Sequence, residues 1–304
     1  MKKTKGKNDY VAHGGSKMSK LELGELQITA LTDIERFDVP LSTIFPEAKS
    51  DEIKNINWIG PEILSSGLLH LKIRSWLLRI NNKVILIDTC VGAHKDRPNW
   101  QDWHHRDGEN WLSALAAEGL KPDDVDVVMC THLHADHVGW NTKLLNGRWV
   151  PTFQNARYIC SKDEYAYWSE AAELGDDKHG AFGDSVLPIM EANKMELVDS
   201  DWDLGPGLHL EMTPGHSPGH MCLKAKHGAG AVFAGDIIHS PIQLAFPEIS
   251  SAFCNDPVQA CESRLKILNE IADHNRFLIP AHFPNPGWMQ IDRHDDGFMP
   301  KFLD

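Results

Sequence analysis

A short segment near the middle of the chain, residues 131–139, combines several side chains that could bind metal ions. It contains three histidines and one aspartate: His132, His134, Asp136 and His137. Neutral imidazole and carboxylate are ligands that proteins offer to zinc and other divalent first-row metals. We expect residues 123–131 to form a buried strand, so that the first two histidines alternate at its end and point to one side. The aspartate and the third histidine then open a helix and face elsewhere, so one segment can supply two metal positions.

Three later segments each place a ligand-type residue directly after a short apolar stretch. The residues are His216 after Thr213-Pro214-Gly215, Asp236 after residues 232–235, and His282 after residues 278–281. A single histidine at a strand end is more often structural than metal-binding. Together with the first segment, however, these residues provide enough nitrogen and oxygen ligands for two metal ions.

The elements that must position these residues follow from hydrophobic periodicity and from turn-forming residues. The expected strands are residues 21–32, 68–80, 83–88, 123–131, 156–160, 197–198, 208–212, 221–225, 231–234 and 277–280. The expected helices are residues 110–118, 161–172, 184–193 and 256–273, and residues 33–51 are expected to form a loop. Asn81-Asn82 suits a hairpin turn, and Ser161 with Glu164 predicts a capping box. This order fits two sheets sandwiched between helices better than one parallel sheet.

The composition restricts the class of protein. With 304 residues, 42% of them hydrophobic and 24% charged, the chain can bury a core as a soluble globular protein. Its formal net charge of −13 disfavours nucleic acid as a partner, because an acidic surface repels phosphate. No apolar run approaches the roughly 20 residues needed to cross a bilayer, so no membrane association is expected.

The N-terminus and the cysteines bear on domain organisation and location. Residues 1–20 are rich in Lys, Gly and Ser and lack an apolar core, so we expect a disordered leader rather than a secretory signal. No linker or repeat follows, so residues 21–304 are expected to form a single domain. Six cysteines are scattered without paired spacing, which favours reduced thiols and a cytoplasmic location.

In these motifs the sequence resembles the metallo-β-lactamase superfamily. The signature HxHxDH appears at residues 132–137, and Thr-Pro-Gly-His at 213–216, Ala-Gly-Asp at 234–236 and Pro-Ala-His at 280–282 follow in the same order. Asp88, in Ile-Asp-Thr, also matches, and the resemblance extends from about residue 22 to residue 290. It implies an α/β fold, an αββα sandwich of two mixed sheets flanked by helices, with metals where the strands end.

The resemblance also implies a role for each ligand-type residue. One metal would take His132, His134 and His216, the other would take Asp136, His137 and His282, and Asp236 would bridge the two. Asp88 would orient a ligand histidine, although it could instead cap the turn after its strand. The cofactors would be two divalent metal ions, with Zn favoured and Mn, Fe or Co also acceptable.

The expected chemistry follows from the two ions. They would lower the pKa of a bridging water, and the resulting hydroxide would attack a carbonyl or phosphoryl centre. Asp136 or a metal-bound water could then protonate the leaving group. We therefore expect a hydrolase with Asp136, Asp236 and His239 as catalytic residues. Lactonases of this superfamily often carry a tyrosine at the position of His239, so this histidine could donate to the oxyanion or merely pack beside the metals.

Within the superfamily, the loops rather than the metal ligands select the substrate. Class B β-lactamases are disfavoured, because they place a cysteine in the region of Asp236. The sequence is similar to the branch that contains N-acyl-homoserine lactonases and methyl-parathion-hydrolase-like enzymes. We expect a small-molecule lactone or carboxylic ester as the substrate, with an organophosphate as the alternative. A metal-bound binding module without turnover is a further alternative, and a homodimer is one open form of assembly.

Two aromatic-rich loops and one further histidine have open roles. Residues 157–190 contain Tyr158, Tyr165, Tyr167, Trp168, His179 and Phe182, and an earlier loop contains Trp100, Trp103, His104 and His105. Such side chains could line an apolar pocket over the metals or simply pack against the core. His220 is expected to support the structure or a ligand rather than bind metal itself.

Overall fold

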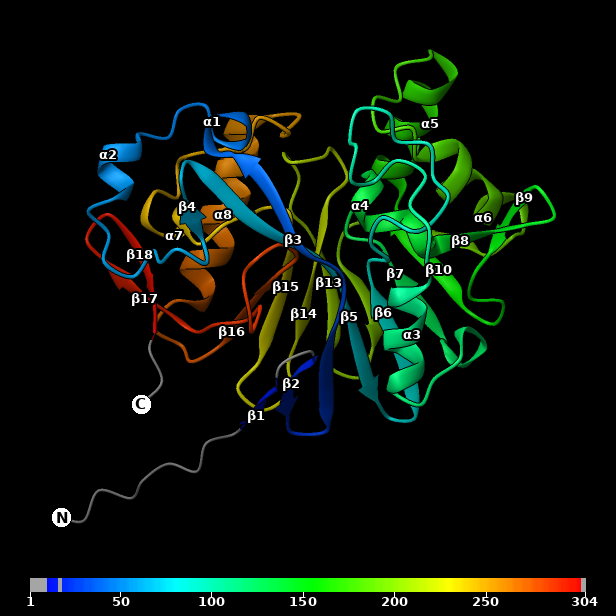
Figure 1. Cartoon of the computed structure of the whole chain (residues 1–304). Coiled ribbons are helices and arrows are strands. Elements are labelled where there is room, and N and C mark those ends of the chain that lie inside the picture. Colours follow the sequence, from blue (N-terminus) through cyan, green and yellow to red (C-terminus); the bar gives the residue numbers. More distant parts are fainter. Residues whose placement is uncertain (1–9, 16–17, 302–304) are drawn as a thin grey trace.

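The structure is a computed structural model and describes residues 10–15 and 18–301. Two large sheets lie in the middle of the molecule, between outer groups of helices (Figure 1). The first sheet has the order β1-β2-β3-β5-β6-β7-β10-β11, with β4 also paired to β5. Its strands are β1 (Tyr10–Gly15), β2 (Met18–Leu23), β3 (Leu26–Pro40), β4 (Leu64–Ser65), β5 (Leu68–Ile80), β6 (Lys83–Ile87), β7 (Val127–Met129), β10 (Arg157–Ser161) and β11 (Met195–Val198).

The second sheet has the order β12-β13-β14-β15-β16. Its strands are β12 (Trp202–Gly205), β13 (Leu208–Met212), β14 (Met221–Ala225), β15 (Ala231–Gly235) and β16 (Phe277–Pro280). Two small hairpins are formed by β8 (Thr142–Leu145) with β9 (Arg148–Pro151) and by β17 (Ile291–His294) with β18 (Gly297–Pro300). The helices are α1 (Leu41–Ile44), α2 (Ser50–Ile53), α3 (Asn110–Ala117), α4 (Ala135–Val138), α5 (Lys162–Glu173), α6 (Leu187–Glu191), α7 (Ile242–Ala245) and α8 (Pro257–Ile271), with short turns η1 (Pro122–Asp124), η2 (Gly139–Asn141) and η3 (Phe182–Val186).

Adjacent residues of the central strands belong to different apolar layers, because successive strand side chains point to opposite faces. Leu77 belongs to the cluster that includes Trp111 of α3, whereas Leu78 belongs to the cluster between the sheets that includes Phe233. Leu268 of α8 belongs to a third cluster, which covers the outer face of the second sheet. These three layers confirm the expected αββα sandwich.

The carboxyl ends of parallel strands carry the candidate ligands. β6 runs parallel to β7 in the first sheet, and β15 runs parallel to β16 in the second. Parallel neighbours end at the same edge of their sheet, so the segments after them lie close together. Asp88 follows β6, residues 131–137 follow β7, Asp236 follows β15 and His282 follows β16.

The N-terminal part of the chain differs from the expectation. Strands β1 and β2 pair antiparallel, and β2 pairs with β3, so backbone hydrogen bonds place residues 10–15 and 18–20 in the first sheet rather than in a disordered leader. Residues 1–9 and 16–17 of the expected leader lie outside the described residues. Residues 33–40, expected to be loop, extend β3 because they pair with β5 across an irregular register.

Several other expectations are confirmed. The hairpin between β5 and β6 turns at Asn81 and Asn82, whose φ angles of 49° and 60° suit a type I′ turn. Strands β13, β14 and β16 have the expected bounds, and α8 begins after Asp256, whose side chain accepts hydrogen bonds from two backbone amides. No helix in the described part of the chain combines the length and the apolar character needed to cross a membrane.

Candidate metal centre

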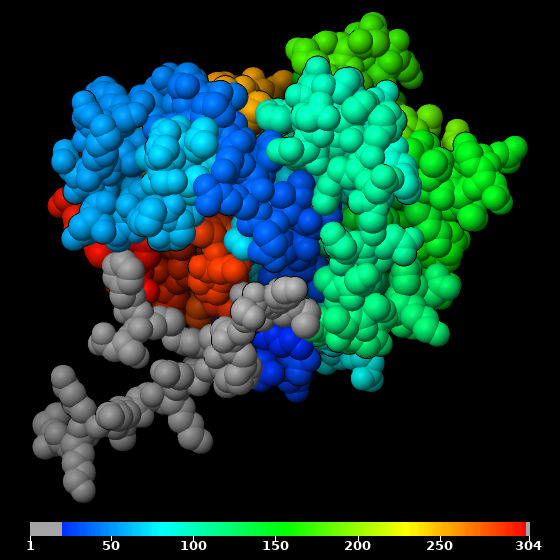
Figure 2. Space-filling view, viewed as in Figure 1, coloured from blue at the N-terminus to red at the C-terminus, as the bar shows by residue number. Residues whose placement is uncertain are grey.

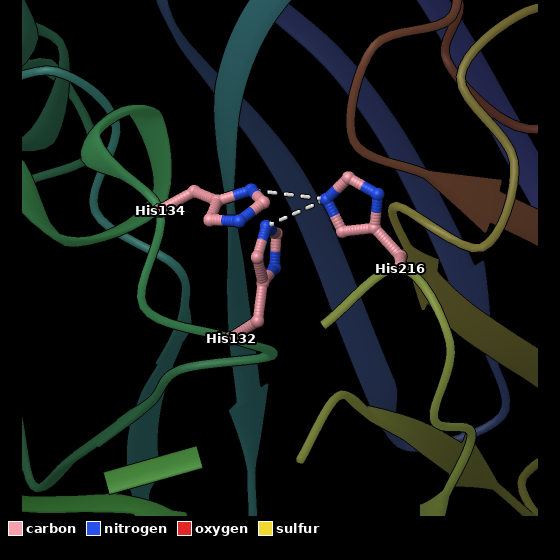
Figure 3. Close-up of side chains that lie close together, drawn as sticks. All are labelled: His132, His134 and His216. Atoms are coloured by element: carbon pink, nitrogen blue, oxygen red, sulfur yellow. Dashed lines mark hydrogen bonds between the residues drawn. The ribbon is translucent and has the colours of Figure 1, made fainter. Parts of the chain in front are cut away.

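Three buried imidazoles converge at one point, and we call His132, His134 and His216 the three-histidine group. Nε2 of His216 lies 3.2 Å from Nε2 of His132 and 3.0 Å from Nδ1 of His134 (Figure 3). Ligand nitrogens around a tetrahedral zinc ion, at the usual Zn–N distance, are about 3.3 Å apart. The three nitrogens therefore have the spacing of ligands that share one metal ion.

A second cluster, which we call the mixed group, consists of Asp136, His137 and His282. Their ligand atoms lie within 4.8 Å of one another. Oδ2 of Asp136 is 3.7 Å from Nε2 of His137 and 3.6 Å from Nε2 of His282. A carboxylate and two imidazoles are again a donor set for a divalent first-row metal.

Asp236 lies between the two groups. Its Oδ2 is 3.5 Å from Nε2 of His216 in the three-histidine group and 3.4 Å from Nε2 of His137 in the mixed group. Nε2 of His137 and Oδ1 of Asp236 are buried atoms without a hydrogen-bond partner in the described part of the chain. Buried polar atoms are rarely left unpaired, so these two atoms fit a cation bound beside His137 and Asp236.

The two groups differ in their electrostatics. Burial, and then the charges of neighbouring histidines, lower the pKa of His132 and His134 well below the usual range. Burial also lowers the pKa of His137, but the charges of Asp236, Asp136 and Asp88 outweigh it, so the pKa is raised well above the usual range. The three-histidine group therefore favours neutral imidazoles, the form that binds metal, even without an ion present.

Asp88 contacts both the motif backbone and one candidate ligand. Its Oδ2 accepts a hydrogen bond of 2.8 Å from Nδ1 of His137, and its Oδ1 accepts one of 2.7 Å from the backbone N–H of Thr131. The contact with His137 agrees with the expected orienting role. Because Nδ1 of His137 donates, Nε2 is the ring nitrogen that would bind a metal at the mixed group, once it has released its proton.

His220 and His239 lie close to the seven candidate ligands but differ in their free ring atoms. Nε2 of His220 accepts from the backbone N–H of Asp236 at 3.0 Å, and its Nδ1 donates to Oγ1 of Thr213 at 2.9 Å. Burial lowers the pKa of His220 to about 3, so the ring is neutral and has no free nitrogen for a metal. Both ring nitrogens of His239 lack hydrogen bonds among the described residues, and Nε2 is 3.3 Å from Oδ2 of Asp236.

An apolar pocket opens over these residues. Its apolar lining comes from Phe37, Ile44, Leu71, Ile73, Trp100, Trp103 and Phe253, and its polar lining from His134, Asp136, His179, His216, Asp236, His239 and His282. In Figure 2 the blue β3–α1 segment adjoins the cyan-to-green loop that carries the two tryptophans. Rings of Trp100 and Phe37 are in contact there, with centroids 5.6 Å apart.

The pocket explains part of the aromatic composition of the two loops. Trp100 and Trp103 line it, whereas His104 and His105 do not. From the second loop only His179 lines the pocket, and its ring stacks on His134 with centroids 4.1 Å apart. The other apolar residues of the pocket come from β3, α1, β5 and the segment after α7. No sequence motif marked them, because an apolar residue looks the same in sequence whether it faces the core or a substrate.

Comparisons with known proteins agree with this geometry. Residues 71–282 match the protein family described as the metallo-β-lactamase superfamily. An N-acyl homoserine lactonase of Bacillus cereus is 27% identical over 177 residues, which are 54% of this chain. The chain spans 62% of the length of that relative. The lactonase AiiB of Agrobacterium fabrum is 24% identical over 226 residues, 70% of this chain and 72% of its own length.

Two solved structures share the fold over nearly the whole chain. The hydrolase AbOPH of the beta-lactamase superfamily has a TM-score of 0.78 and 25% identity, with 96% of this chain and 100% of that chain covered. AidC, a dizinc quorum-quenching lactonase, has a TM-score of 0.74 and 22% identity, with 94% of this chain and 98% of that chain covered. Because the family match covers more than half of the sequence and includes all seven candidate ligands, the chain belongs to the metallo-β-lactamase superfamily.

Proposed function

We propose that this protein is a metal-dependent hydrolase that opens lactones or cleaves carboxylic esters at a two-metal site. The observation that carries the proposal is the position of Asp236, which lies within 3.5 Å of a nitrogen from each candidate metal group. His132, His134 and His216 would hold one ion, Asp136, His137 and His282 the other, and Asp236 would contact both. Zinc suits this donor set, as do Mn, Fe and Co.

The bound ions would supply a nucleophilic water near neutral pH and would polarise the scissile carbonyl. The chain would supply proton transfer and charge stabilisation around them. Asp136 lines the pocket, where its carboxyl can deliver a proton to the leaving oxygen. His239 also lines the pocket, and an N–H of its unpaired ring can donate to the oxygen on which negative charge develops.

The pocket lining supports an uncharged, apolar substrate. Within the described residues, the lining includes no lysine or arginine that could pair with an anionic group. Trp100, Trp103, Phe37 and Phe253 offer a wall on which an acyl chain or an aryl group can be buried. The lactonase names of the relatives favour a lactone among such substrates.

An aryl phosphotriester is the alternative substrate. The observation that favours it is His239, which stands where a tyrosine would assist a lactone carbonyl in the lactonase branch. A phosphoryl centre can be attacked by the same nucleophile and would also present an apolar aryl group to the tryptophans.

Residues 21–304, together with the N-terminal strand residues 10–15 and 18–20 that join the first sheet, would act as one hydrolase domain. The supporting observation is that His132 and His216 belong to segments that follow different sheets, so neither half of the sandwich holds the complete site.

A substrate panel on metal-analysed protein tests the proposed function. Purified protein loaded with zinc, and separately with manganese, is assayed on lactones of increasing acyl length, aryl carboxylic esters and an aryl phosphotriester. We expect the highest kcat/KM on a lactone or an ester, and loss of turnover in the chelator-treated control. Faster turnover of the phosphotriester would support the alternative, and hydrolysis of none of these substrates would support a binding module.

A further inference from the structure

Glu164 is a fully buried carboxylate at the start of α5, outside both metal groups. The backbone N–H of Glu164 donates to Oγ of Ser161 at 3.0 Å, which confirms one half of the expected capping box. The carboxylate does not complete the box by turning back to the N–H of Ser161. It extends instead into the space between the two segments that carry the three-histidine group.

One oxygen of Glu164 contacts the segment that contains His132 and His134. Oε1 accepts a hydrogen bond of 2.9 Å from the backbone N–H of Leu133, the residue between the two histidines. The same oxygen accepts a bond of 2.8 Å from the indole Nε1 of Trp168, whose ring meets His134 edge-on with centroids 5.4 Å apart. Oε1 thus holds two groups in place: the backbone between His132 and His134, and the Trp168 ring beside His134.

The other oxygen of Glu164 contacts the segment that contains His216. Oε2 accepts hydrogen bonds from the hydroxyl of Ser217, the next residue, and from the backbone N–H of Gly219 at 2.9 Å. Three N–H groups and one hydroxyl therefore converge on a single carboxylate, and an ionised carboxylate accepts such bonds with both oxygens. Burial raises the pKa of Glu164, and the hydrogen bonds from Ser217, Leu133 and Trp168 oppose that rise.

The start of α5 packs so closely against the segment after His216 that no additional side-chain atom fits between them. A Cβ atom on Gly219 would lie 2.1 Å from the backbone nitrogen of Glu164, so only glycine permits this contact. Oγ of Ser161 also donates to the carbonyl of Gly219 at 2.7 Å. The start of α5 is therefore fastened to this segment by side-chain and backbone contacts together.

We propose that Glu164 is a positioning residue that sets the spacing of the three-histidine group by joining its two backbone segments through one carboxylate. The proposal rests on the proposed function, in that the group is taken to hold a metal ion. Glu164 would touch neither the ion nor the substrate. Among the described residues its carboxylate accepts hydrogen bonds from Leu133, Trp168, Ser217 and Gly219, and from none of Asp136, His137 and His282, so we expect its effect at one metal position.

The test measures the affinity of each metal position directly. Wild-type protein and Glu164→Gln are titrated with zinc against a chromophoric chelator, and the occupancy of each position at limiting zinc is read from anomalous diffraction. Glutamine keeps the shape of the side chain but places an amide NH₂ where an acceptor is needed. We expect affinity at the three-histidine position to fall by about 10–100-fold, the range typical of residues that support metal ligands, with the other position unchanged.

Two further variants make the result specific. Glu118→Gln changes another carboxylate with a buried side chain, which pairs with Lys20 and Arg79 away from the site, and should leave both affinities unchanged. Ser217→Ala removes one donor and keeps the carboxylate, so it should weaken the same position by a smaller factor. If Glu164→Gln does not fold, the outcome for Ser217→Ala decides.

The outcomes separate this inference from the proposed function. Equal zinc affinity at the three-histidine position in wild type, Glu164→Gln and Ser217→Ala would overturn the positioning role and leave the hydrolase proposal intact. Equal weakening of both positions would also overturn it, since a general structural defect would then account for the loss. Normal two-site binding by the wild type without hydrolysis of any substrate would overturn the proposed function alone.

Discussion

The three-histidine group and the mixed group lie on either side of Asp236, yet their rings have different partners. In the mixed group, Nδ1 of His137 donates to Asp88 and Nδ1 of His282 donates to the carbonyl of Lys72, both at 2.8 Å. These strong acceptors orient each ring directly.

The rings of the three-histidine group have weaker partners. Nδ1 of His132 donates to the hydroxyl of Thr131 at 3.0 Å, and Nδ1 of His216 is 3.7 Å from Sγ of Cys254. His134 is held by ring contacts with His179 and Trp168. The mixed group is therefore oriented through hydrogen bonds to its rings. The three-histidine group depends more on hydrogen bonds to the backbone that carries it, where Glu164 acts.

Removing a ligand from the three-histidine group should give the largest effect. In His134→Ala the group loses one of its three nitrogens, so we expect hydrolysis to fall to background and the metal content to drop. Elemental analysis together with kcat/KM on the best substrate measures both. A fully active His134→Ala variant would remove this residue from the site.

His239→Phe tests the position that faces both groups. The ring shape is kept while both nitrogens are lost, so we expect kcat to fall by about 100-fold, as for removal of one oxyanion donor. Metal content should stay unchanged, because His239 is not assigned to either ion. A parallel loss of one metal equivalent would instead make His239 a ligand, and an unchanged kcat would leave it a packing residue.

Asp88→Asn is the counterpart of the Glu164 variant in the mixed group. The amide is a weaker acceptor for Nδ1 of His137 and cannot accept from Thr131 with both atoms, so His137 should be less well oriented. We expect zinc affinity at the mixed group to fall about 10-fold, with the three-histidine position retained. Weaker zinc binding at the three-histidine group instead would contradict the inference that each group is supported by its own carboxylate.

Replacing Lys95 should have the smallest effect. It also serves as a control, because Lys95 lies away from both metal groups. Its buried ammonium donates to Oγ1 of Thr142 at 2.6 Å, and burial lowers its pKa from 10.5 to about 7. Between these values the unfolded chain binds more protons, so this group makes the folded state more stable as pH rises from about 7 towards 10.5. The slope is at most about 1.4 kcal/mol per pH unit for one proton.

The variant Lys95→Met should remove that slope and leave both metal affinities unchanged. Chemical denaturation of wild type and variant at pH 7, 8 and 9 gives the free energies of unfolding to compare. Parallel pH profiles would show that Lys95 does not titrate in this window, and a loss of metal would show that the contacts of Lys95 also support the metal site.

The sequence singled out the candidate ligands, which the structure brings together, better than it predicted their surroundings. Histidine and carboxylate have few reasons to recur at strand ends, so residues such as His132, Asp236 and His282 stood out. Strands with clear turn chemistry, such as the hairpin at Asn81-Asn82, were also predictable. Each of these features is specified by neighbouring residues in the sequence, so it can be recognised without knowing the tertiary contacts.

The supports and the pocket walls were not predictable, because they depend on which segments meet in space. Glu164 has the spacing of a helix cap, and only the fold brings Leu133 and Gly219 to its carboxylate. Phe37 lies in a segment expected to be loop, which pairs with β5 and places the ring beside Trp100. The short hairpins β8–β9 and β17–β18 were missed, because their strands have four residues each and weak alternation.

Anomalous diffraction from zinc-loaded crystals would locate the bound ions. We expect two peaks, one among the ring nitrogens of His132, His134 and His216 and one among Asp136, His137 and His282, with the Asp236 carboxylate between them. A single peak elsewhere, or zinc-containing protein whose Asp236 contacts no ion, would contradict this expectation.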